Sequence, residues 1–256
     1  VFPACDVTYA AARKILETVR SERGERTLRV VGGVGISIDP AEGARRMGPA
    51  ADLCLYGEGE RTLAEVVERR LAGGGMAGIA GTVRIEEGGV VREAPRPLIK
   101  NLDSLPFPAY ELFDSVGERM AEYPMMTSRG CPFNCIFCLN KTLTQRTFRH
   151  RSPENVVAEI EYARDRFKFD ALYIWDDHFS LVRERAERVC RMLIERKLNI
   201  RYYLPDGIRA DSVTPEFARL LKESGCAGAS IGFEDANPET FAHIQKGEKY
   251  EEIIQA

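Results

Sequence analysis

The chain has 256 residues, enough for one large domain or two modest ones. Acidic and basic residues nearly balance at a formal net charge of −3, which indicates no general attraction to nucleic acid. No apolar run approaches the length of a membrane span, and no secretory signal is visible. Seven cysteines in this context indicate a reducing cytoplasm and metal chemistry. Because the chain opens at Val1, we expect it to be a fragment of a longer protein.

The first 95 residues alternate between amphipathic and β-rich stretches. The expected elements are a helix over 9–23, a strand over 28–31, a helix from Asp39, a strand over 52–56, a helix from about Gly59 to Leu71, and a β-hairpin that turns at 86–89. In the helix that ends near Leu71, we expect Leu63, Val66, Val67 and Leu71 to face inward. The alternation predicts a parallel sheet with helices on both faces.

Two glycine-containing turns follow strands in this region. The turns contain Gly32 and Gly33, and Gly57, Glu58, Gly59 and Glu60. Glycine at such a position lets a ligand approach the backbone closely. A plain tight turn is the competing interpretation, and it is the more frequent one for a lone Gly-Gly pair.

Residues 96–120 are rich in proline and are expected to form an extended connector between two domains, 1–95 and 121–256. The second domain repeats a unit of strand, loop and capped helix. Three of its helices are expected to open with a cap residue, a proline and a glutamate, at Ser152, Thr214 and Asn237. With the strand that precedes the cysteines, the pattern predicts four βα units of a (β/α) barrel.

Residues 127–140 read T-S-R-G-C-P-F-N-C-I-F-C-L-N and carry Cys131, Cys135 and Cys138. Three thiolates at this spacing leave a four-iron cluster one ligand short, so that one iron is open to a small molecule. A structural zinc site needs a fourth ligand, and His150 lies well downstream. A disulfide is not expected in a chain without signs of secretion. The spacing therefore favours an iron–sulfur site.

Polar residues recur at the ends of the predicted strands: Asp176, Asp177, Arg209 and Glu234. The carboxyl ends of parallel barrel strands gather on one face, so these residues are expected beside the cysteines. A helix cap or a solvated turn is the alternative for each carboxylate, and for Asp177 the two interpretations weigh equally.

Other residues are given ordinary structural roles. Arg146, Arg149 and Arg151 are by default expected to form a solvated face, and a role near an anionic substrate or the cofactor carboxylate is the alternative. Trp175 and Phe179 are expected in the core or a pocket wall. No catalytic residue is assigned, since lone histidines such as His150 and His178 are weak indications.

The cysteine stretch resembles the radical S-adenosylmethionine (radical SAM) superfamily, in which an aromatic residue, here Phe137, precedes the last cysteine. The resemblance implies a partial six-unit (β/α) barrel, a 4Fe-4S cluster on the three cysteines, and SAM bound at the open iron and cleaved reductively. It also implies that SAM lies across the strand ends. The expected contacts are the Phe137 backbone, Asp176, Asp177, Arg209 and Glu234, with the aspartate pair standing where the superfamily usually shows Gly-Gly-Glu.

The glycine turns of residues 1–95 resemble the second half of a cobalamin-binding Rossmann-like domain. In that pattern Gly32 and Gly33 end a strand, Pro40 and Glu42 open a helix, and residues 57–60 end the next strand. The proline-rich connector is also similar to the segment that follows such domains. The resemblance implies cobalamin as a further cofactor.

Together these resemblances imply a cytoplasmic cobalamin-dependent radical SAM enzyme, most simply a methyltransferase acting on an unactivated carbon or phosphorus. The same cofactors also serve radical cyclisation, ring contraction or oxygen insertion. Two other classes stay open: a non-catalytic iron–sulfur electron carrier and a zinc-stabilised binding module. The expected partners are a small-molecule or natural-product substrate and a flavodoxin- or ferredoxin-type electron donor, with neither nucleic acid nor membrane.

Overall fold

The computed structural model describes residues 6–113 and 120–256. The chain divides into two compact units, Val1–Ile99 and Lys100–Ala256. Residues 114–119 of the predicted connector lie outside the described residues.

The first unit has a four-stranded mixed sheet in the order β1-β2-β3-β4. Its elements are α1 (Asp6–Arg23), β1 (Val30–Val31), α2 (Val34–Ile38), α3 (Pro40–Met47), β2 (Leu53–Leu55), α4 (Gly59–Leu71), β3 (Thr82–Glu86) and β4 (Gly89–Arg92). Strands β1 and β2 are parallel, as expected. The predicted hairpin is present as β3 and β4, and it joins the same sheet because β3 pairs antiparallel with β2. The sheet is therefore mixed, and the short helix α2 was not predicted.

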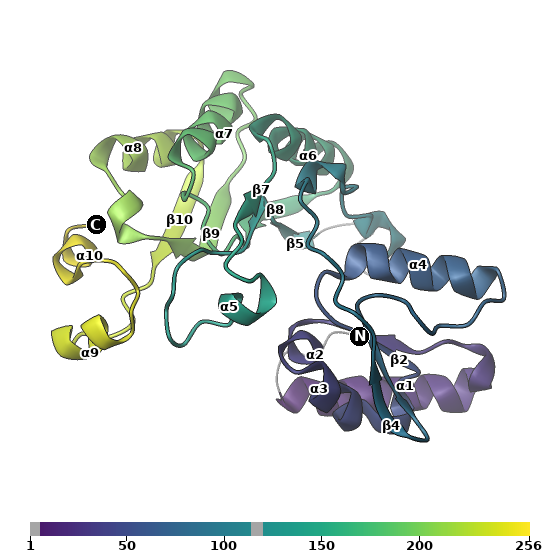
Figure 1. Ribbon diagram of the computed structural model, residues 1–256. Helices are drawn as coiled ribbons and strands as arrows, with labels where there is room; N and C mark the ends of the chain where they lie inside the picture. Colours follow the sequence, from purple (N-terminus) through teal and green to yellow (C-terminus); the bar gives the residue numbers. More distant parts are fainter. Residues whose placement is uncertain (1–5, 114–119) are drawn as a thin grey trace. The chain divides into compact units, whose positions relative to one another are not determined.

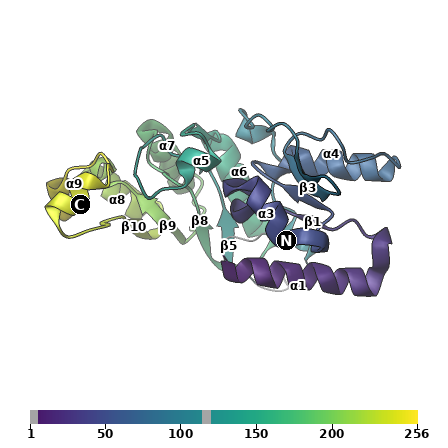
Figure 2. The same ribbon diagram turned by 60° about the horizontal axis from the view of Figure 1, so that its bottom comes forward.

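Helices cover both faces of this sheet, as the alternation predicted. Cys54 of β2 packs in a cluster with Leu16 of α1 and Met47 of α3. Its neighbours Leu53 and Leu55 pack in a second cluster with Val66 of α4. Figure 2 shows α1 and α4 on opposite sides of the strands. The division follows from the two-residue period of a strand, which turns successive side chains to opposite faces.

The predicted inward face of α4 is wrong for most of its residues. Val66 is buried, whereas Leu63, Val67 and Leu71 are exposed, Leu71 to 83%. The α4 face of the sheet is narrow: Val66 shares its cluster with two β2 residues and Ile79. One residue per turn then fills the contact, and the flanking apolar positions stay at the surface.

The second unit has a four-stranded parallel sheet in the order β10-β9-β8-β5, so that strands consecutive along the chain are neighbours in space (Figure 1). Its main elements are β5 (Met120–Met125), β6 (Ser128–Arg129), α5 (Asn140–Leu143), β7 (Arg149–His150), α6 (Pro153–Arg166), β8 (Phe169–Ile174), α7 (Arg183–Glu195), β9 (Tyr202–Ile208), α8 (Pro215–Glu223), β10 (Cys226–Ile231), α9 (Pro238–His243) and α10 (Tyr250–Gln255). This is the predicted series of four βα units, with each strand within a few residues of its expected place.

Local capping starts the helices where the sequence predicted. The side chains of Ser152, Thr214 and Asn237 each accept a backbone N–H from the first turn of the following helix, and proline occupies the first helical position. Asp39 caps α3 in the same way through the Glu42 N–H. These bonds satisfy donors that the first turn of a helix leaves without partners.

The core of the second unit lies between its sheet and helices α6, α7 and α8. Leu172 and Ile174 of β8 and Tyr202 and Leu204 of β9 are buried in one cluster with residues of these helices. The alternate residues Tyr173 and Tyr203 stack on the other face, with ring centroids 5.0 Å apart. The helices therefore cover one face of the sheet, and the strand ends deliver their loops to one edge.

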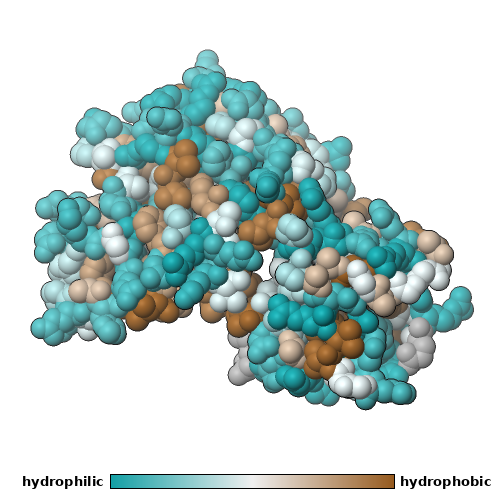
Figure 3. Space-filling view, viewed as in Figure 1, coloured by the Kyte–Doolittle hydropathy of each residue, from teal (hydrophilic) through white to brown (hydrophobic). Residues whose placement is uncertain are grey.

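The visible surface carries apolar side chains in separate patches and in no single band (Figure 3). Within the described ranges, no helix is long and apolar enough to cross a membrane.

Candidate functional site

The three cysteines lie on the loop between β6 and β7, which follows the carboxyl end of β5. All three are half-buried. The Cys138 N–H donates to the Cys135 carbonyl at 3.2 Å, and helix α5 begins two residues after Cys138. Between Cys135 and Cys138, the Ile136 N–H donates to the Ile244 carbonyl at 3.0 Å. The loop, named here the cysteine loop (residues 130–140), is thus anchored at a point distant in sequence.

Asp176 holds residues 127–128, the segment between β5 and the cysteine loop that is called the loop root below. Its carboxylate is buried and accepts the backbone N–H groups of Thr127 at 2.5 Å and Ser128 at 3.0 Å, together with both of their hydroxyls. Burial raises the pKa of Asp176, while Arg185, the hydroxyls of Thr127 and Ser128 and the Thr127 N–H act against that rise. A carboxylate with this many donors fixes the chain between β5 and the cysteines. Asp176 therefore lies beneath the loop and offers no surface to a cofactor.

Asp177 lies at the surface and binds the two ends of the cysteine loop. Its carboxylate accepts the Gly130 N–H and the Asn140 side-chain amide, each at 2.8 Å. Gly130 has a φ of +87°, and a Cβ there would lie far inside van der Waals contact of the Thr147 carbonyl. This position therefore requires glycine.

A buried arginine network lies below the loop root and corrects the expectation of a solvated basic face. Arg149 and Arg151 are both buried. Arg151 pairs with Glu159 and donates to the Met126 carbonyl at 3.1 Å. Arg185 donates to the Thr127 carbonyl at 2.8 Å. Arg151 and Arg185 lie inside because these backbone carbonyls and the Glu159 carboxylate replace water as their partners.

Phe133 anchors the middle of the cysteine loop. The Arg209 guanidinium lies 3.6 Å from the Phe133 ring centroid, and the His178 ring centroid lies 5.8 Å away. Burial, followed by the Arg209 charge, lowers the pKa of His178 to about 4, so its ring is neutral at pH 7. The neutral His178 ring and the Arg209 guanidinium therefore both pack against the Phe133 ring and hold it in place.

Arg209, a predicted cofactor contact, is engaged by the protein itself. Its guanidinium donates to Asp211 at 2.7 Å and to the carbonyls of Lys246 and Gly247 at 2.7 and 3.1 Å. The side chain is 9% exposed. Arg209 therefore ties the end of β9 to the segment after α9 and positions Phe133.

Glu234, like Asp177, is a predicted strand-end residue with open surface. Its side chain is 32% exposed and pairs with Lys246 at 3.1 Å. Lys246 is itself buried and also pairs with Glu248 at 3.1 Å. Glu234 has a φ of +63°, a conformation that non-glycine residues adopt mainly where neighbouring structure imposes it. Phe137, also predicted to contact the cofactor, is 54% exposed on the cysteine loop.

Neighbouring charges shift the thiol pKa values of Cys131 and Cys135. Burial raises the pKa of Cys131, and Asp177 and the other two cysteines raise it further. Burial and Cys138 also raise the pKa of Cys135, whereas Lys246 and Arg209 lower it. Because the neighbouring cysteines raise the pKa of Cys131 and of Cys135, a bound cation would favour the thiolate forms of these two residues.

The donor set suits an iron–sulfur cluster. Within the described residues, no group of three or more His, Cys, Asp or Glu side chains is already arranged around a point that would hold a single metal ion. The three half-buried thiols nevertheless share one short loop and influence one another electrostatically. Three thiols on one short loop, with exposed apolar side chains at Ile136 and Phe137 between them, are the ligand set that a four-iron cluster with one open iron requires.

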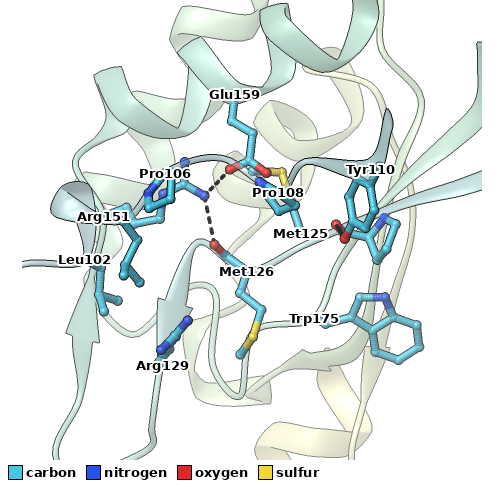
Figure 4. Close-up of a pocket in the computed structure, with 12 residues that line it drawn as sticks. Leu102, Pro106, Pro108, Tyr110, Met125, Met126, Arg129, Arg151, Glu159 and Trp175 are labelled. Atoms are coloured by element: carbon cyan, nitrogen blue, oxygen red, sulfur yellow. Dashed lines mark hydrogen bonds and ion pairs between the residues drawn. The ribbon is translucent and has the colours of Figure 1, made fainter. Parts of the chain in front are cut away.

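A cavity of about 390 Å³ lies beside the loop root, between β5 and residues 102–110 (Figure 4). Trp175 and Tyr110 line one side, and Arg151, which pairs with Glu159, lines the opposite side. Trp175 is thus a wall residue, as expected, whereas Phe179 is buried in the core.

The glycine turns of the first unit line a second cavity, of about 360 Å³. Its walls include Gly32, Gly33, Gly57, Gly59 and Glu60. Glu58, the remaining residue of the predicted set, instead accepts the Ile99 N–H at 2.6 Å.

Sequence reasoning missed several residues that shape the site, namely Phe133, Asn140, Glu159, Arg185, Lys246 and Glu248. Each acts through a partner far away in the chain, for example Asn140 through Asp177 and Lys246 through Glu234. A local signal was available at Gly232, two residues before Glu234. A Cβ on Gly232 would meet the side chains of Glu234 and Lys246.

A parallel βα sheet that presents a C-x3-C-x2-C loop at its carboxyl edge defines the class of protein. The chain belongs to the radical SAM superfamily, whose family model matches residues 125–256, more than half of the chain.

Similar proteins extend the match into the first unit. An uncharacterised methyltransferase, PH0819 of Pyrococcus horikoshii, is 32% identical over 91% of this chain. The radical SAM methyltransferase TsrM of Kitasatospora setae, solved with its tryptophan substrate and a SAM analogue, superposes over 96% of this chain with a TM-score of 0.77 and 20% identity. The cobalamin-dependent SAM radical enzyme OxsB, solved with aqua-cobalamin and SAM, superposes over 96% with a TM-score of 0.73 and 22% identity. The chain spans 50%, 49% and 36% of these three proteins, respectively.

Proposed function

We propose that this chain is part of a cobalamin-dependent radical SAM enzyme that transfers a methyl group to an unactivated carbon or phosphorus of a small molecule. The observation that carries the proposal is the cysteine loop, which presents three half-buried thiols at the carboxyl edge of a parallel sheet. The family match supports the SAM chemistry. The methyltransferases PH0819 and TsrM support methyl transfer, and the cobalamin-dependent enzyme OxsB supports cobalamin as a cofactor.

In this proposal Cys131, Cys135 and Cys138 hold a 4Fe-4S cluster. The cluster, when bound, supplies the electron that cleaves SAM, and the protein supplies orientation and shelter from water. Asp176 and Arg209 position the loop, through its root and through Phe133. Glu234 and the backbone at Phe137 have the open surface from which to contact SAM.

We expect Glu234→Ala to weaken SAM binding. Losing a hydrogen bond to a charged group costs about 1.5–3 kcal/mol, which corresponds to roughly tenfold or more in affinity. The fold should tolerate the change because Lys246 keeps its pairing with Glu248. Calorimetric titration of SAM into the anaerobic protein measures the effect. Glu239→Ala, in the first turn of α9, is the matched control. An unchanged affinity in Glu234→Ala would remove Glu234 from the SAM site.

The cavity in the first unit is the proposed contact surface for cobalamin. Its glycines leave room for a ligand where side chains would stand. Gly33 and Gly57 have φ values of +114° and +76°, so any side chain there strains the backbone regardless of a ligand. Gly59 lies in α4 at an ordinary φ with nothing within 4 Å of an added Cβ. Gly59 is therefore the position that separates ligand contact from backbone strain.

We expect Gly59→Val to reduce cobalamin affinity by about tenfold or more, the equivalent of about 1.4 kcal/mol of lost contact. The valine would project into the cavity without distorting the helix. Equilibrium dialysis with hydroxocobalamin measures the affinity, and Gly75→Val, in open space outside the cavity, is the control. If Gly59→Val binds cobalamin as well as the parent protein, the turns are structural and the cobalamin proposal loses its support from this unit.

The competing outcomes are separable by product and by metal. A substrate that gains one methyl group supports methyl transfer, whereas cyclisation, ring contraction or oxygen insertion gives a different mass change. An electron carrier would hold a cluster but leave SAM intact after reduction. A zinc-stabilised module would hold zinc and neither iron nor sulfide.

The remaining assignments belong to the same proposal. The cobalamin-binding part is placed at 1–95, the connector at 96–120 and the barrel part at 121–256. A flavodoxin- or ferredoxin-type protein is proposed as electron donor, and the cytoplasm as the location.

A further inference from the structure

Asp177 is bonded to both ends of the cysteine loop. It lies 47 residues from Gly130 and 37 from Asn140 in sequence, yet its two carboxylate oxygens accept one donor from each. The segment between those two residues contains all three cysteines. One carboxylate thus closes the loop at its neck, which removes much of the conformational freedom that a loop of this length would have.

The backbone that carries Asp177 is held in place by the residue before it. It lies three residues beyond the end of β8, and the preceding residue Asp176 is buried and bonded to Thr127 and Ser128. Helix capping does not explain Asp177. Helix α7 begins at Arg183, and its N-cap, Val182, makes no side-chain capping bond. A solvated turn does not explain it either, because both oxygens are occupied by loop donors.

The position of the carboxylate also matters electrostatically. The Gly130 N–H that it accepts belongs to the residue immediately before Cys131. The cations around the loop make their contacts elsewhere: Arg209 packs over Phe133, Lys246 pairs with Glu234, and Arg146 donates to Asn134. A negative charge beside one edge of a cluster disfavours the gain of an electron, and charge near an iron–sulfur cluster is a main determinant of its potential.

We propose that Asp177 is a positioning residue for the cluster. Its two hydrogen bonds, called the clasp below, hold the two ends of the cysteine loop together, and its negative charge keeps the reduction potential of the bound cluster low. The inference rests on the proposed function for the cluster itself, but the clasp is a property of the chain alone. A low potential is what a cluster needs in order to reduce SAM.

Three variants separate the clasp from the charge. Asp177→Asn removes the charge and can keep both bonds, because the Asn140 amide can turn its oxygen toward the new donor. Asp177→Ala removes both bonds and the charge. Asn140→Ala removes one bond and leaves the charge. Asp206→Asn is the control. Asp206 is an exposed carboxylate on the neighbouring strand β9, and the negative charge of Asp177 contributes to raising the pKa of Asp206, after burial.

The clasp is tested without any cofactor, by hydrogen exchange at the Gly130 amide in the cluster-free protein. We expect Asp177→Ala to exchange about tenfold faster or more, and Asp177→Asn and Asp206→Asn to exchange as the parent does. Thermal unfolding checks that the variants remain folded. A Gly130 amide that exchanges equally fast in the parent and in Asp177→Ala overturns the clasp.

The charge is tested in the cluster-loaded protein by a redox titration followed by electron paramagnetic resonance. We expect the midpoint potential of Asp177→Asn to shift positive, while that of Asn140→Ala stays at the parent value. Equal potentials in Asp177→Asn and the parent, at equal iron content, overturn the electrostatic role. A parent protein that takes up no cluster would defeat the proposed function, while the Gly130 exchange would still decide the clasp.

Discussion

Replacing any one of Cys131, Cys135 and Cys138 with alanine is expected to abolish cluster binding and reductive cleavage of SAM. Three protein thiolates already leave one iron open, so a site with two cannot hold a stable four-iron cluster. The other described cysteines cannot substitute. Cys54 and Cys190 are buried in the two cores, and burial raises the pKa of Cys54 to about 12, which disfavours the thiolate that a metal requires.

The measurement is iron and sulfide content after anaerobic reconstitution, together with 5′-deoxyadenosine formation from SAM under a strong reductant. Cys226→Ala is the matched control, since Cys226 is half-buried like the loop cysteines but lies on β10. The control should keep the full iron content and the activity. A triple variant of the loop cysteines that still binds a full complement of iron would show that the cluster lies elsewhere.

Gly130→Ala is expected to have the second largest effect, because three constraints meet at this residue. Its backbone has a left-handed φ of +87°, and an added Cβ would collide with the Thr147 carbonyl. Its N–H donates to Asp177 at 2.8 Å. Relieving the collision requires a shift of the loop neck, and a residue forced into a strained conformation costs about 1–3 kcal/mol before any lost hydrogen bond.

We therefore expect Gly130→Ala to lower the thermal midpoint by several degrees and to lose most of its iron on reconstitution. A loss of about 2 kcal/mol shifts the midpoint of a domain with 150–250 residues by about 4–8 °C. Gly75→Ala is the control, because Gly75 has an ordinary φ and open space around an added Cβ. Equal midpoints and equal iron content in Gly130→Ala and the parent would contradict the constraint.

The sequence by itself determined the elements and the chemistry that depend on neighbours in the chain. The caps at Asp39, Ser152, Thr214 and Asn237 are bonds within one helical turn, so the residue type and its spacing were sufficient. The cysteine triplet is equally local, since three thiols within eight residues must share a loop. The strand order of the second unit followed from repetition of one βα unit.

Tertiary structure alone decided which charged residues are buried and what they bind. Asp176 and Arg209 look from sequence like ligands at strand ends, but their partners are Thr127 and Ser128 for the former and Asp211 and the 246–247 backbone for the latter. The exposed apolar residues of α4 and the burial of Arg151 have the same origin. Burial depends on which distant segment arrives at a side chain, and a buried charge is tolerated only where that segment brings its hydrogen-bond partners.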